Sequence, residues 1–245
     1  MEHPSPLLPG TFNSRDVGGL PASGGIVRHR VLVRSDALIA LSADDRSVLR
    51  QLAPATAIDL REDVERGVDR ADLDGLDVNV RELPILGEDF DLRSVGSLEN
   101  VYRILLETRG PRLTAAVRAL ARPGALPAVV SCSAGKDRTG LVVALALAAL
   151  GVSDDDIVAD YSRSEQNMSG RFRAAIEARA RAAGISEQEL AAKVGAPPAL
   201  MRASLEWLRE HHGGAVGYLR HHGMTEAELD ALRGALIERS AANAA

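Results

Sequence analysis

The fold of this chain is decided by residues 129–140, which read Val-Val-Ser-Cys-Ser-Ala-Gly-Lys-Asp-Arg-Thr-Gly. The apolar run that leads into them, residues 127–131, predicts a short buried strand. Gly135 predicts a tight loop after that strand. The apolar residues that follow Arg138 predict a buried helix over 138–150. The stretch therefore predicts a strand, a short loop and the start of a helix in direct succession.

Cys132, the only cysteine of the chain, stands at the end of the predicted strand, and Arg138 follows after five residues. A loop this short aims successive backbone N–H groups at one point, and the positive end of the helix adds to them. Such a nest binds a tetrahedral oxyanion such as phosphate. A sulfur at its floor is favoured as a nucleophilic thiolate. Arg138 can bind two phosphate oxygens, and Thr139 offers a hydroxyl beside the sulfur.

Two other interpretations fit parts of this stretch. An inert core thiol is common after an apolar run, but it leaves the polar residues 135–139 around Cys132 unexplained. A nucleotide-binding loop requires Gly, four residues and then Gly-Lys-Ser/Thr. Here Asp137 and Arg138 follow Lys136, so that pattern is absent from this part of the chain.

Residues 132–140 resemble the signature loop of cysteine-dependent protein tyrosine phosphatases. More narrowly, they are similar to a bacterial branch whose loop reads Cys-x-Ala-Gly-Lys-Asp-Arg-Thr-Gly, some members of which act on phosphotyrosine, phosphoserine/threonine and phosphoinositides. The branch also resembles this chain at Asn13–Gly19, at Arg34-Ser35 and at Asp160-Tyr161-x-x-Ser164. The resemblance covers about residues 10–237, and it implies a phosphatase of phosphoproteins or phosphoinositides.

The resemblance also implies a two-step reaction without a metal or cofactor. Cys132 would attack phosphorus, and water would then hydrolyse the phosphocysteine intermediate. Arg138 and the backbone N–H groups of the loop would hold the phosphoryl oxygens. The substrate-binding loop residues are then Ser133, Ala134, Gly135 and Lys136.

The general acid is less directly indicated. Many tyrosine phosphatases use an Asp in a Trp-Pro-Asp run, but Trp207, the only tryptophan, is not followed by Pro-Asp. The resemblance to the bacterial branch implies Asp137 in this role. Asp89 and Asp91, in an acidic loop, are the alternatives.

Two further positions bear on activity. Lys136 offers a second positive charge at the expected mouth of the pocket, where it is either a solvated lysine or a contact for an additional substrate phosphate. Ser131 stands where family members usually have a histidine. A serine hydroxyl still forms hydrogen bonds but carries no positive charge. We therefore expect Ser131 to change the acidity of the nucleophile and the pH optimum relative to relatives.

Composition limits the other classes of function. The 245 residues carry a net charge of −5, which argues against general nucleic-acid binding. A single cysteine excludes an intramolecular disulfide and fits a reducing compartment. Residues 1–10 do not form a recognisable signal peptide, and the longest apolar run, 141–150, is too short to span a membrane. We expect a cytoplasmic protein without a transmembrane segment, although secretion without a recognisable signal stays open.

Alternating strands and helices predict an α/β fold, a mostly parallel central sheet flanked by helices, as in tyrosine phosphatases. We expect a flexible tail over residues 1–10 and one domain over 11–240. Strands are predicted within 26–33, 56–60, 78–85 and 127–131. Helices are predicted at 42–52, 98–108, 113–121, 138–150, from 153, 170–193, 200–211 and 225–237.

Several charged residues outside the loop have a structural interpretation. We expect Arg15, Asp16, Arg34 and Asp36 to form a charge network. We expect the Asp59-Leu60-Arg61 run, with Glu65 beyond it, to brace a strand end. Arg30 stands where the resemblance predicts a turn glycine, so the local turn is expected to differ.

Two histidine pairs, at 211–212 and 221–222, lie at expected helix ends, and neighbouring side chains on a helix do not face together. We therefore expect no metal site there.

Two alternative functions stay open at this point. One is a module that recognises phosphoproteins or phosphoinositides with little turnover. The other is a different cysteine–arginine chemistry, such as sulfur transfer or arsenate reduction, which the absence of further cysteines disfavours.

Overall fold

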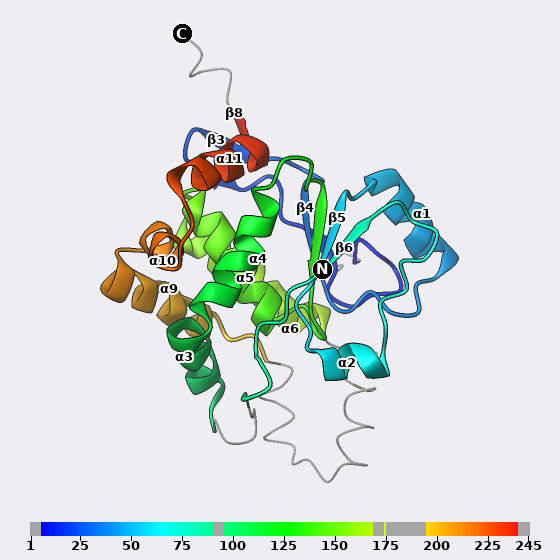
Figure 1. Ribbon diagram of the computed structural model, residues 1–245, viewed down its shortest axis with the longest axis horizontal. Helices are drawn as coiled ribbons and strands as arrows, with labels where there is room; N and C mark the ends of the chain where they lie inside the picture. Colours follow the sequence, from blue (N-terminus) through cyan, green and yellow to red (C-terminus); the bar gives the residue numbers. More distant parts are fainter. Residues whose placement is uncertain (1–5, 91–95, 169–173, 175–194, 240–245) are drawn as a thin grey trace.

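The computed structural model describes residues 6–90, 96–168, 174 and 195–239. A five-stranded sheet lies at the centre of the molecule, in the order β1-β4-β7-β5-β6 (Figure 1). Strands β4, β7, β5 and β6 run parallel, and β1 is antiparallel to β4. The bounds are Arg15–Asp16 for β1, Leu32–Ser35 for β4, Thr56–Asp59 for β5, Asn79–Glu82 for β6 and Ala128–Ser131 for β7. The predicted α/β class with a mostly parallel sheet is confirmed.

Helices cover both faces of this sheet. Helix α1 (Ala43–Leu52) lies beside β5 and β6, whereas most of the other helices gather across the sheet from it (Figure 1). Those helices are α3 (Leu98–Thr108), α4 (Gly110–Leu120), α5 (Asp137–Ala149), α6 (Asp154–Asn167), α9 (Pro198–His212) and α10 (Ala215–His221). The buried helix α5 packs directly behind the central strands, which places its first turn at the carboxyl end of β7.

The alternation of side chains along the strands divides the core in two. Val33, Ala57 and Val129 are in register across β4, β5 and β7, and they pack with α1. Ile58 and Val130 point to the other face and join the larger core that includes α5. Each central strand is therefore buried on both faces, as expected for a parallel sheet.

Local signals in the sequence explain several element ends. Ser42 caps α1 by accepting a hydrogen bond from Asp45 N at 3.1 Å, while the Asp45 carboxylate accepts one from Ser42 N at 2.9 Å. Both bonds of the predicted capping box are therefore present. Helix α3 has the predicted bounds. Helix α4 begins at residue 110 rather than 113, because Pro111 fits the first turn of a helix.

Other elements were not predicted. Helices α2 (Asp63–Val68) and α10 are short, and neither range was predicted from the sequence. A second sheet joins β2 (Pro21–Ala22) and β3 (Gly25–Val27) to β8 (Ile237–Arg239). Strand β8 follows α11 (Glu226–Leu236), so the helix expected to end at residue 237 ends one residue earlier. The helix expected over 170–193 lies outside the described residues, apart from residue 174.

The second half of the segment expected to be a flexible tail packs against the domain. Leu8 is fully buried against α1, and its backbone N–H donates to Ser14 Oγ at 2.7 Å. Gly10 N donates to Asp45 Oδ1 at 2.8 Å. The apolar side chain of Leu8 thus fixes this segment on the domain, while residues 1–5 lie outside the described part.

In the turn between β3 and β4, a residue other than glycine has the left-handed backbone conformation. Arg30 has φ +60°, and its backbone N–H donates to Asp16 Oδ2 at 2.9 Å. This hydrogen bond supports a conformation that residues other than glycine rarely adopt.

Within the described ranges, no helix is both long and apolar enough to cross a membrane.

Candidate active site

The loop 132–136 joins β7 to α5 at the carboxyl end of the parallel sheet. Open α/β sheets bind ligands at this end. Cys132 stands directly after β7 with only 2% of its surface exposed. Helix α5 begins at Asp137, so its unpaired N–H groups and its positive end lie at the loop, as the sequence predicted.

Carbonyl groups of this loop are held by the N-terminal part of the chain. Asn13 Nδ2 donates to Ala134 O and Gly135 O, both at 3.0 Å. Arg34 NH2 donates to Gly135 O at 2.8 Å, and Ala37 N donates to Ser133 O at 3.3 Å. Because N–H and C=O point in opposite directions in a trans peptide, these contacts leave the N–H groups of the loop facing the other way.

Gly135 is required by the close contact between the loop and the end of β4. Its φ is +63°, and an added Cβ would lie 2.5 Å from Ser35 C and Asp36 N. A side chain at this position would therefore both strain the backbone and push the loop away from β4. The glycine of the motif serves the shape of the loop.

A buried ion-pair network stands behind the loop. Arg15 Nε contacts Asp160 Oδ1 at 2.8 Å, and Arg34 NH1 contacts Asp160 Oδ2 at 2.5 Å. Burial opposes the charged form of this carboxyl, but the charges of Arg34 and Arg15 lower the pKa of Asp160 well below its usual range. Arg15 NH2 also donates to Ser164 Oγ at 3.1 Å. The Asp160-Tyr161-x-x-Ser164 run thus supplies the partners of the two arginines.

The four charged residues expected to form one network therefore separate. Asp36 accepts hydrogen bonds from the backbone N–H groups of Phe12 and Asn13, at 3.1 and 2.9 Å. Its burial raises the pKa of Asp36, against these hydrogen bonds. Asp16 instead accepts a hydrogen bond from the backbone N–H of Arg30 in the turn before β4. The expectation was correct for Arg15 and Arg34, whose acidic partner is Asp160.

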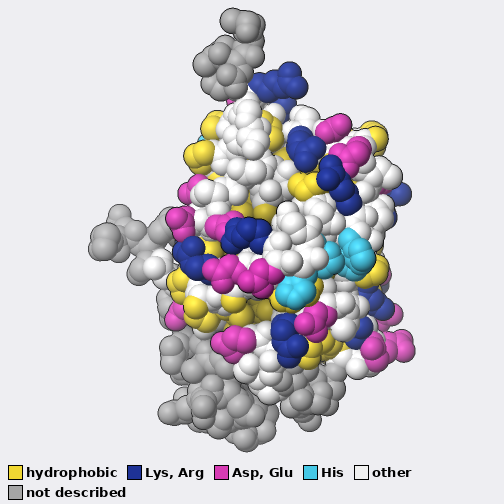
Figure 2. Space-filling model, turned by 90° about the vertical axis from the view of Figure 1, so that its left-hand side faces the viewer, with side chains coloured by type: hydrophobic (Ala, Val, Ile, Leu, Met, Phe, Trp, Pro, Cys, Tyr) yellow, Lys and Arg dark blue, Asp and Glu magenta, His cyan; other side chains and the backbone are white. Residues whose placement is uncertain are grey.

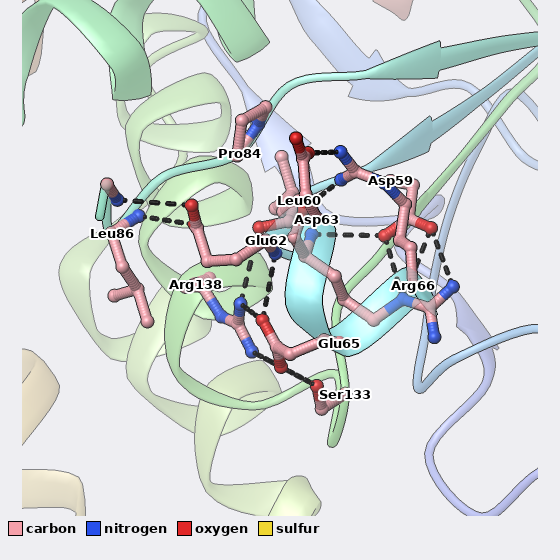
Figure 3. Close-up of polar contacts among 12 residues, drawn as sticks. Asp59, Leu60, Glu62, Asp63, Glu65, Arg66, Pro84, Leu86, Ser133 and Arg138 are labelled. Atoms are coloured by element: carbon pink, nitrogen blue, oxygen red, sulfur yellow. Dashed lines mark hydrogen bonds and ion pairs between the residues drawn. The ribbon is translucent and has the colours of Figure 1, made fainter. Parts of the chain in front are cut away.

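Arg138 is held by Glu65 on α2 (Figure 3). Arg138 NH1 contacts Glu65 Oε2 at 2.5 Å, and NH2 donates to Oε1 at 2.8 Å. Ser133 Oγ donates to the same carboxylate and accepts from Arg138 NH2 at 3.1 Å. Burial disfavours the charged carboxylate, but Arg138 and Ser133 hold the pKa of Glu65 at about 2.

Arg138 and Glu65 each stabilise the charged form of the other. Burial acts against the Arg138 guanidinium, yet the hydrogen bond to Glu65 and the negative charge of Glu65 raise the pKa of Arg138 above its usual value. Glu62, at the start of α2, accepts hydrogen bonds from Leu86 N and Gly87 N at 2.7 and 3.2 Å (Figure 3). Helix α2 thereby connects the loop after β6 to Arg138.

Glu65 therefore differs from its expected role as a brace of the strand end. That role belongs to Asp59 and Arg61, whose side chains pair with an NH2–Oδ2 distance of 2.8 Å. Glu65 instead orients the guanidinium of Arg138. No local sequence signal predicts this pairing, because 73 positions separate the two residues.

Asp137 lies in the first turn of α5 with 31% of its side chain exposed. Its Oδ1 accepts a hydrogen bond from Tyr102 OH at 2.8 Å. The alternative acid Asp89 is exposed and pairs with Arg109 NH2 at 2.8 Å, and this hydrogen bond lowers the pKa of Asp89. Asp91 lies outside the described residues.

Lys136 does not lie at the mouth of the pocket as expected. Its side chain is fully buried, and Nζ donates to Gly195 O at 2.7 Å. Nζ also lies 3.5 Å from Asp137 Oδ1. Because a buried ammonium needs polar partners, these contacts explain how its charge is accommodated inside the protein.

Two hydroxyl groups complete this region. Thr139 is fully buried, and its Oγ1 has no hydrogen-bond partner among the described residues, so a bond to the sulfur is not formed. Ser131 is buried at the end of β7, beside Ser35 and Asp59 of the neighbouring strands. Its effect on the acidity of the nucleophile stays a prediction.

The two histidine pairs at 211–212 and 221–222 gather elsewhere, where α9 meets α10, on the face shown in Figure 2. His211 stacks on Trp207 with ring centroids 4.5 Å apart, and the ring of His212 lies 5.0 Å from that of His221. Within the described part of the chain, these side chains do not form a group suited to hold a metal ion.

Comparison with known proteins agrees with this arrangement. The model of the tyrosine phosphatase family matches residues 6–238. The chain is 31% identical over 282 residues to the triple specificity protein phosphatase PtpB of Mycobacterium tuberculosis, covering 94% of this chain and 98% of the relative. It is 30% identical to a putative tyrosine-protein phosphatase of Cupriavidus necator, covering 91% and 84%. A tyrosine-protein phosphatase of Nostoc commune is 29% identical, covering 82% and 72%. The chain therefore belongs to the tyrosine phosphatase family and is a phosphatase.

Proposed function

We propose that this enzyme hydrolyses phosphotyrosine through a covalent phosphocysteine intermediate on Cys132. The observation that carries the proposal is that the side chains of Asn13 and Arg34 donate hydrogen bonds to the carbonyl groups of the loop. It supports a loop whose N–H groups converge above Cys132, where a phosphoryl group would bind.

In the first step, the Cys132 thiolate forms the S–P bond while the P–O bond to the leaving group breaks. The backbone N–H groups of the loop and Arg138 stabilise the charge on the non-bridging oxygens. Asp137 gives its carboxyl proton to the leaving oxygen, which departs as a neutral phenol or alcohol.

In the second step, a water molecule attacks phosphorus and the S–P bond breaks. The Asp137 carboxylate, left ionised by the first step, takes a proton from this water. Inorganic phosphate leaves, and the thiolate and the protonated acid are restored. Each proton given in the first step is thus recovered in the second.

We assign the general acid to Asp137 rather than Asp89 because of their surroundings. Asp137 begins the helix that follows the loop, so it lies within the same short motif as Cys132 and Arg138. Asp89 is held as a carboxylate by Arg109 on the surface. A carboxyl that is committed to an arginine is a poor proton donor.

Phosphotyrosine is the first substrate class to test, and the relative named for triple specificity supports testing phosphoserine and phosphoinositides as well. A contact between Lys136 and a second substrate phosphate is a separate proposal. If it is correct, Lys136→Ala lowers phosphoinositide hydrolysis more than aryl phosphate hydrolysis. The burial of Nζ against Gly195 O favours the opposite result, an equal loss on both.

The main test measures phosphate release from a phosphotyrosine peptide, a phosphoserine peptide and a phosphoinositide panel, with chelator and reductant present. We expect turnover in the native enzyme and none in Cys132→Ser. Arg138→Lys should also lose activity, because lysine cannot bind two oxygens with a planar group. Arg109→Lys is the matched control and should retain it.

Turnover that persists in Cys132→Ser would contradict the phosphocysteine mechanism. Binding of phosphopeptide without turnover in the native protein would instead support a recognition module. Loss of activity on chelation would also overturn the proposed reaction, because none of its steps uses a metal.

A further inference from the structure

We infer that Tyr102 and Tyr161 are positioning residues for Asp137, and that together they determine which of its oxygens carries the transferred proton. In this arrangement Tyr161 donates to Tyr102, and Tyr102 donates to Oδ1 of Asp137. The inference rests on the proposed role of Asp137 as the general acid. It adds two residues that lie outside the signature loop.

Three helices bring these groups together. Tyr102 lies on α3, Tyr161 on α6 and Asp137 at the start of α5. Tyr102 OH is 2.8 Å from Asp137 Oδ1 and 3.0 Å from Tyr161 OH. Both tyrosines are only 1% exposed, and their rings pack edge to face with centroids 6.1 Å apart. Burial of both rings leaves their hydroxyl groups few alternative partners.

Gly140 permits this packing one turn into α5. A Cβ at this position would lie 3.2 Å from Cδ2 of Tyr161. The absence of a side chain therefore lets the Tyr161 ring lie against the same turn that carries Asp137. The last glycine of the motif thus has a role in placing the tyrosine pair.

The direction of the hydrogen bonds follows from proton counting. Each phenol has one proton, and an ionised carboxylate only accepts. Tyr102 must therefore donate to Asp137 when that group is ionised, so Tyr161 donates to Tyr102. Burial raises the pKa of both Tyr102 and Tyr161, which keeps the two hydroxyl groups protonated as donors.

The contacts to Asp137 are unequal at its two oxygens. Tyr102 OH and Lys136 Nζ both approach Oδ1, at 2.8 and 3.5 Å. An oxygen that accepts from these donors is a poor place for the acid proton, which is then carried by Oδ2. When Oδ2 gives up that proton, the hydrogen bond from Tyr102 strengthens because its acceptor becomes charged.

Other charged groups act on the same cluster. Lys136 approaches Asp137 from the loop, and Arg34 on β4 favours the ionised form of Tyr161. Glu165 on α6 acts in the opposite direction on Tyr161. The pH dependence of the cluster therefore has to be read from variants that remove one hydroxyl at a time.

The test uses Tyr102→Phe and Tyr161→Phe, with Tyr218→Phe as the matched control. Tyr218 is the third and last tyrosine of the chain and is also buried. Its hydroxyl donates to Leu106 O on α3 at 2.9 Å, one turn from Tyr102. The control thus removes a buried hydroxyl that contacts the same helix but not Asp137.

The readout is kcat/KM as a function of pH for two aryl phosphates, one with a poor and one with a good leaving group. This quantity reports formation of the phosphocysteine and not its hydrolysis. For the poor leaving group, we expect Tyr102→Phe to lower kcat/KM roughly tenfold, since the acid is misplaced. The basic limb of the pH profile of this variant, where activity falls as the acid loses its proton, should move up by about one pH unit. The reason is that the carboxylate loses a hydrogen bond. Tyr161→Phe should act in the same direction with a smaller shift.

The good leaving group needs no proton in the first step, and kcat/KM does not include the second step, so its kcat/KM should change less than about twofold in either variant. Tyr218→Phe should leave both substrates and the basic limb unchanged. A loss in Tyr102→Phe that is equal for the two substrates and does not move the limb would overturn the inference. It would show that the hydroxyl only stabilises the fold.

Asp137→Asn separates this inference from the proposed function. If Asp137→Asn keeps both the basic limb of the pH profile and its rate on the poor leaving group, the general acid lies elsewhere. The inferred role of the two tyrosines is then wrong as well. If the limb is lost in Asp137→Asn but unmoved in Tyr102→Phe, only the inference about the tyrosines is wrong.

Discussion

Glu65 on α2 holds both terminal nitrogens of Arg138 on α5, with N···O distances of 2.5 and 2.8 Å. Two parallel contacts fix the plane of a guanidinium group as well as its position. Arg138 is therefore oriented before a substrate binds, and the entropy of ordering a long side chain is not lost during binding. The short helix α2 thus contributes to the site through a single side chain.

We expect Glu65→Gln to lower kcat/KM for an aryl phosphate by about tenfold, or ~1.4 kcal/mol, because the amide nitrogen cannot accept a hydrogen bond and one of the two contacts is lost. The pKa of Glu65 is about 2, so the carboxylate is ionised throughout the working range. The ratio of native to variant activity should therefore be equal at pH 5 and pH 7. Asp63→Asn, on the same helix with 89% of its side chain exposed, is the control. An equal loss in both variants would contradict a specific role for Glu65.

Asn13→Ala should lower both stability and turnover. The Asn13 side chain is fully buried and holds two loop carbonyls at 3.0 Å. Leaving buried acceptors unpaired costs about 1–3 kcal/mol. We therefore expect a lower melting temperature and, at a temperature where the variant is folded, a lower kcat. Asn79→Ala, at an exposed position of β6, should change neither. A variant that melts lower but retains its full kcat would show that Asn13 does not shape the loop.

Much of the fold could be predicted because its signals are local. The strand before Cys132, the loop with Gly135 and the helix after it are specified by twelve successive residues, and the structure confirms all three. The capping box at Ser42 is likewise contained in four residues. Such patterns depend on neighbours in the sequence, so one chain without relatives is enough to recognise them.

Contacts between distant segments could not be predicted in this way. Nothing in the sequence pairs Glu65 with Arg138, and nothing brings Tyr102 to Asp137 from 35 positions away. Lys136 is a further example, since a lysine in a polar loop is expected to be exposed. Only the packing around the loop shows that its ammonium reaches Gly195 O in the interior.

Asp160→Asn should be among the most damaging single changes. Asp160 lies between Arg15 and Arg34, at 2.8 and 2.5 Å, so its neutralisation leaves two buried cations with reduced compensation. Removing one partner of a buried pair costs about 3–5 kcal/mol. Urea unfolding should show this loss, whereas Asp155→Asn, on the exposed side of the same helix, should stay within about 0.5 kcal/mol. A similar small change in both variants would contradict a structural role for the network.

The same carboxyl predicts a dependence of stability on acid. Its ordinary pKa is 3.8, and the two arginines, acting against burial, lower the pKa of Asp160 in the folded protein. The unfolded chain therefore binds the proton first as the pH falls. The stabilisation is complete above pH ~4 and is lost as the pH falls through the lower folded value. Urea unfolding at pH 3 and pH 6 should show a smaller difference in Asp160→Asn than in the native protein. An equal difference in the two proteins would show that other groups cause the acid sensitivity.

The histidines between α9 and α10 predict a second loss of stability, at milder pH. Burial, followed by the charge of His221, lowers the pKa of His212, and burial also lowers the pKa of His222. Both have an ordinary value of 6.5, so the unfolded chain binds more protons below that pH. Stability is then full above pH ~6.5 and is lost as the pH falls through the folded values. The melting temperature should be lower at pH 5.5 than at pH 7.5, and His212→Gln should reduce the difference. His29→Gln, at a side chain 64% exposed, should leave it unchanged. An undiminished difference in His212→Gln would place the pH sensitivity outside this cluster.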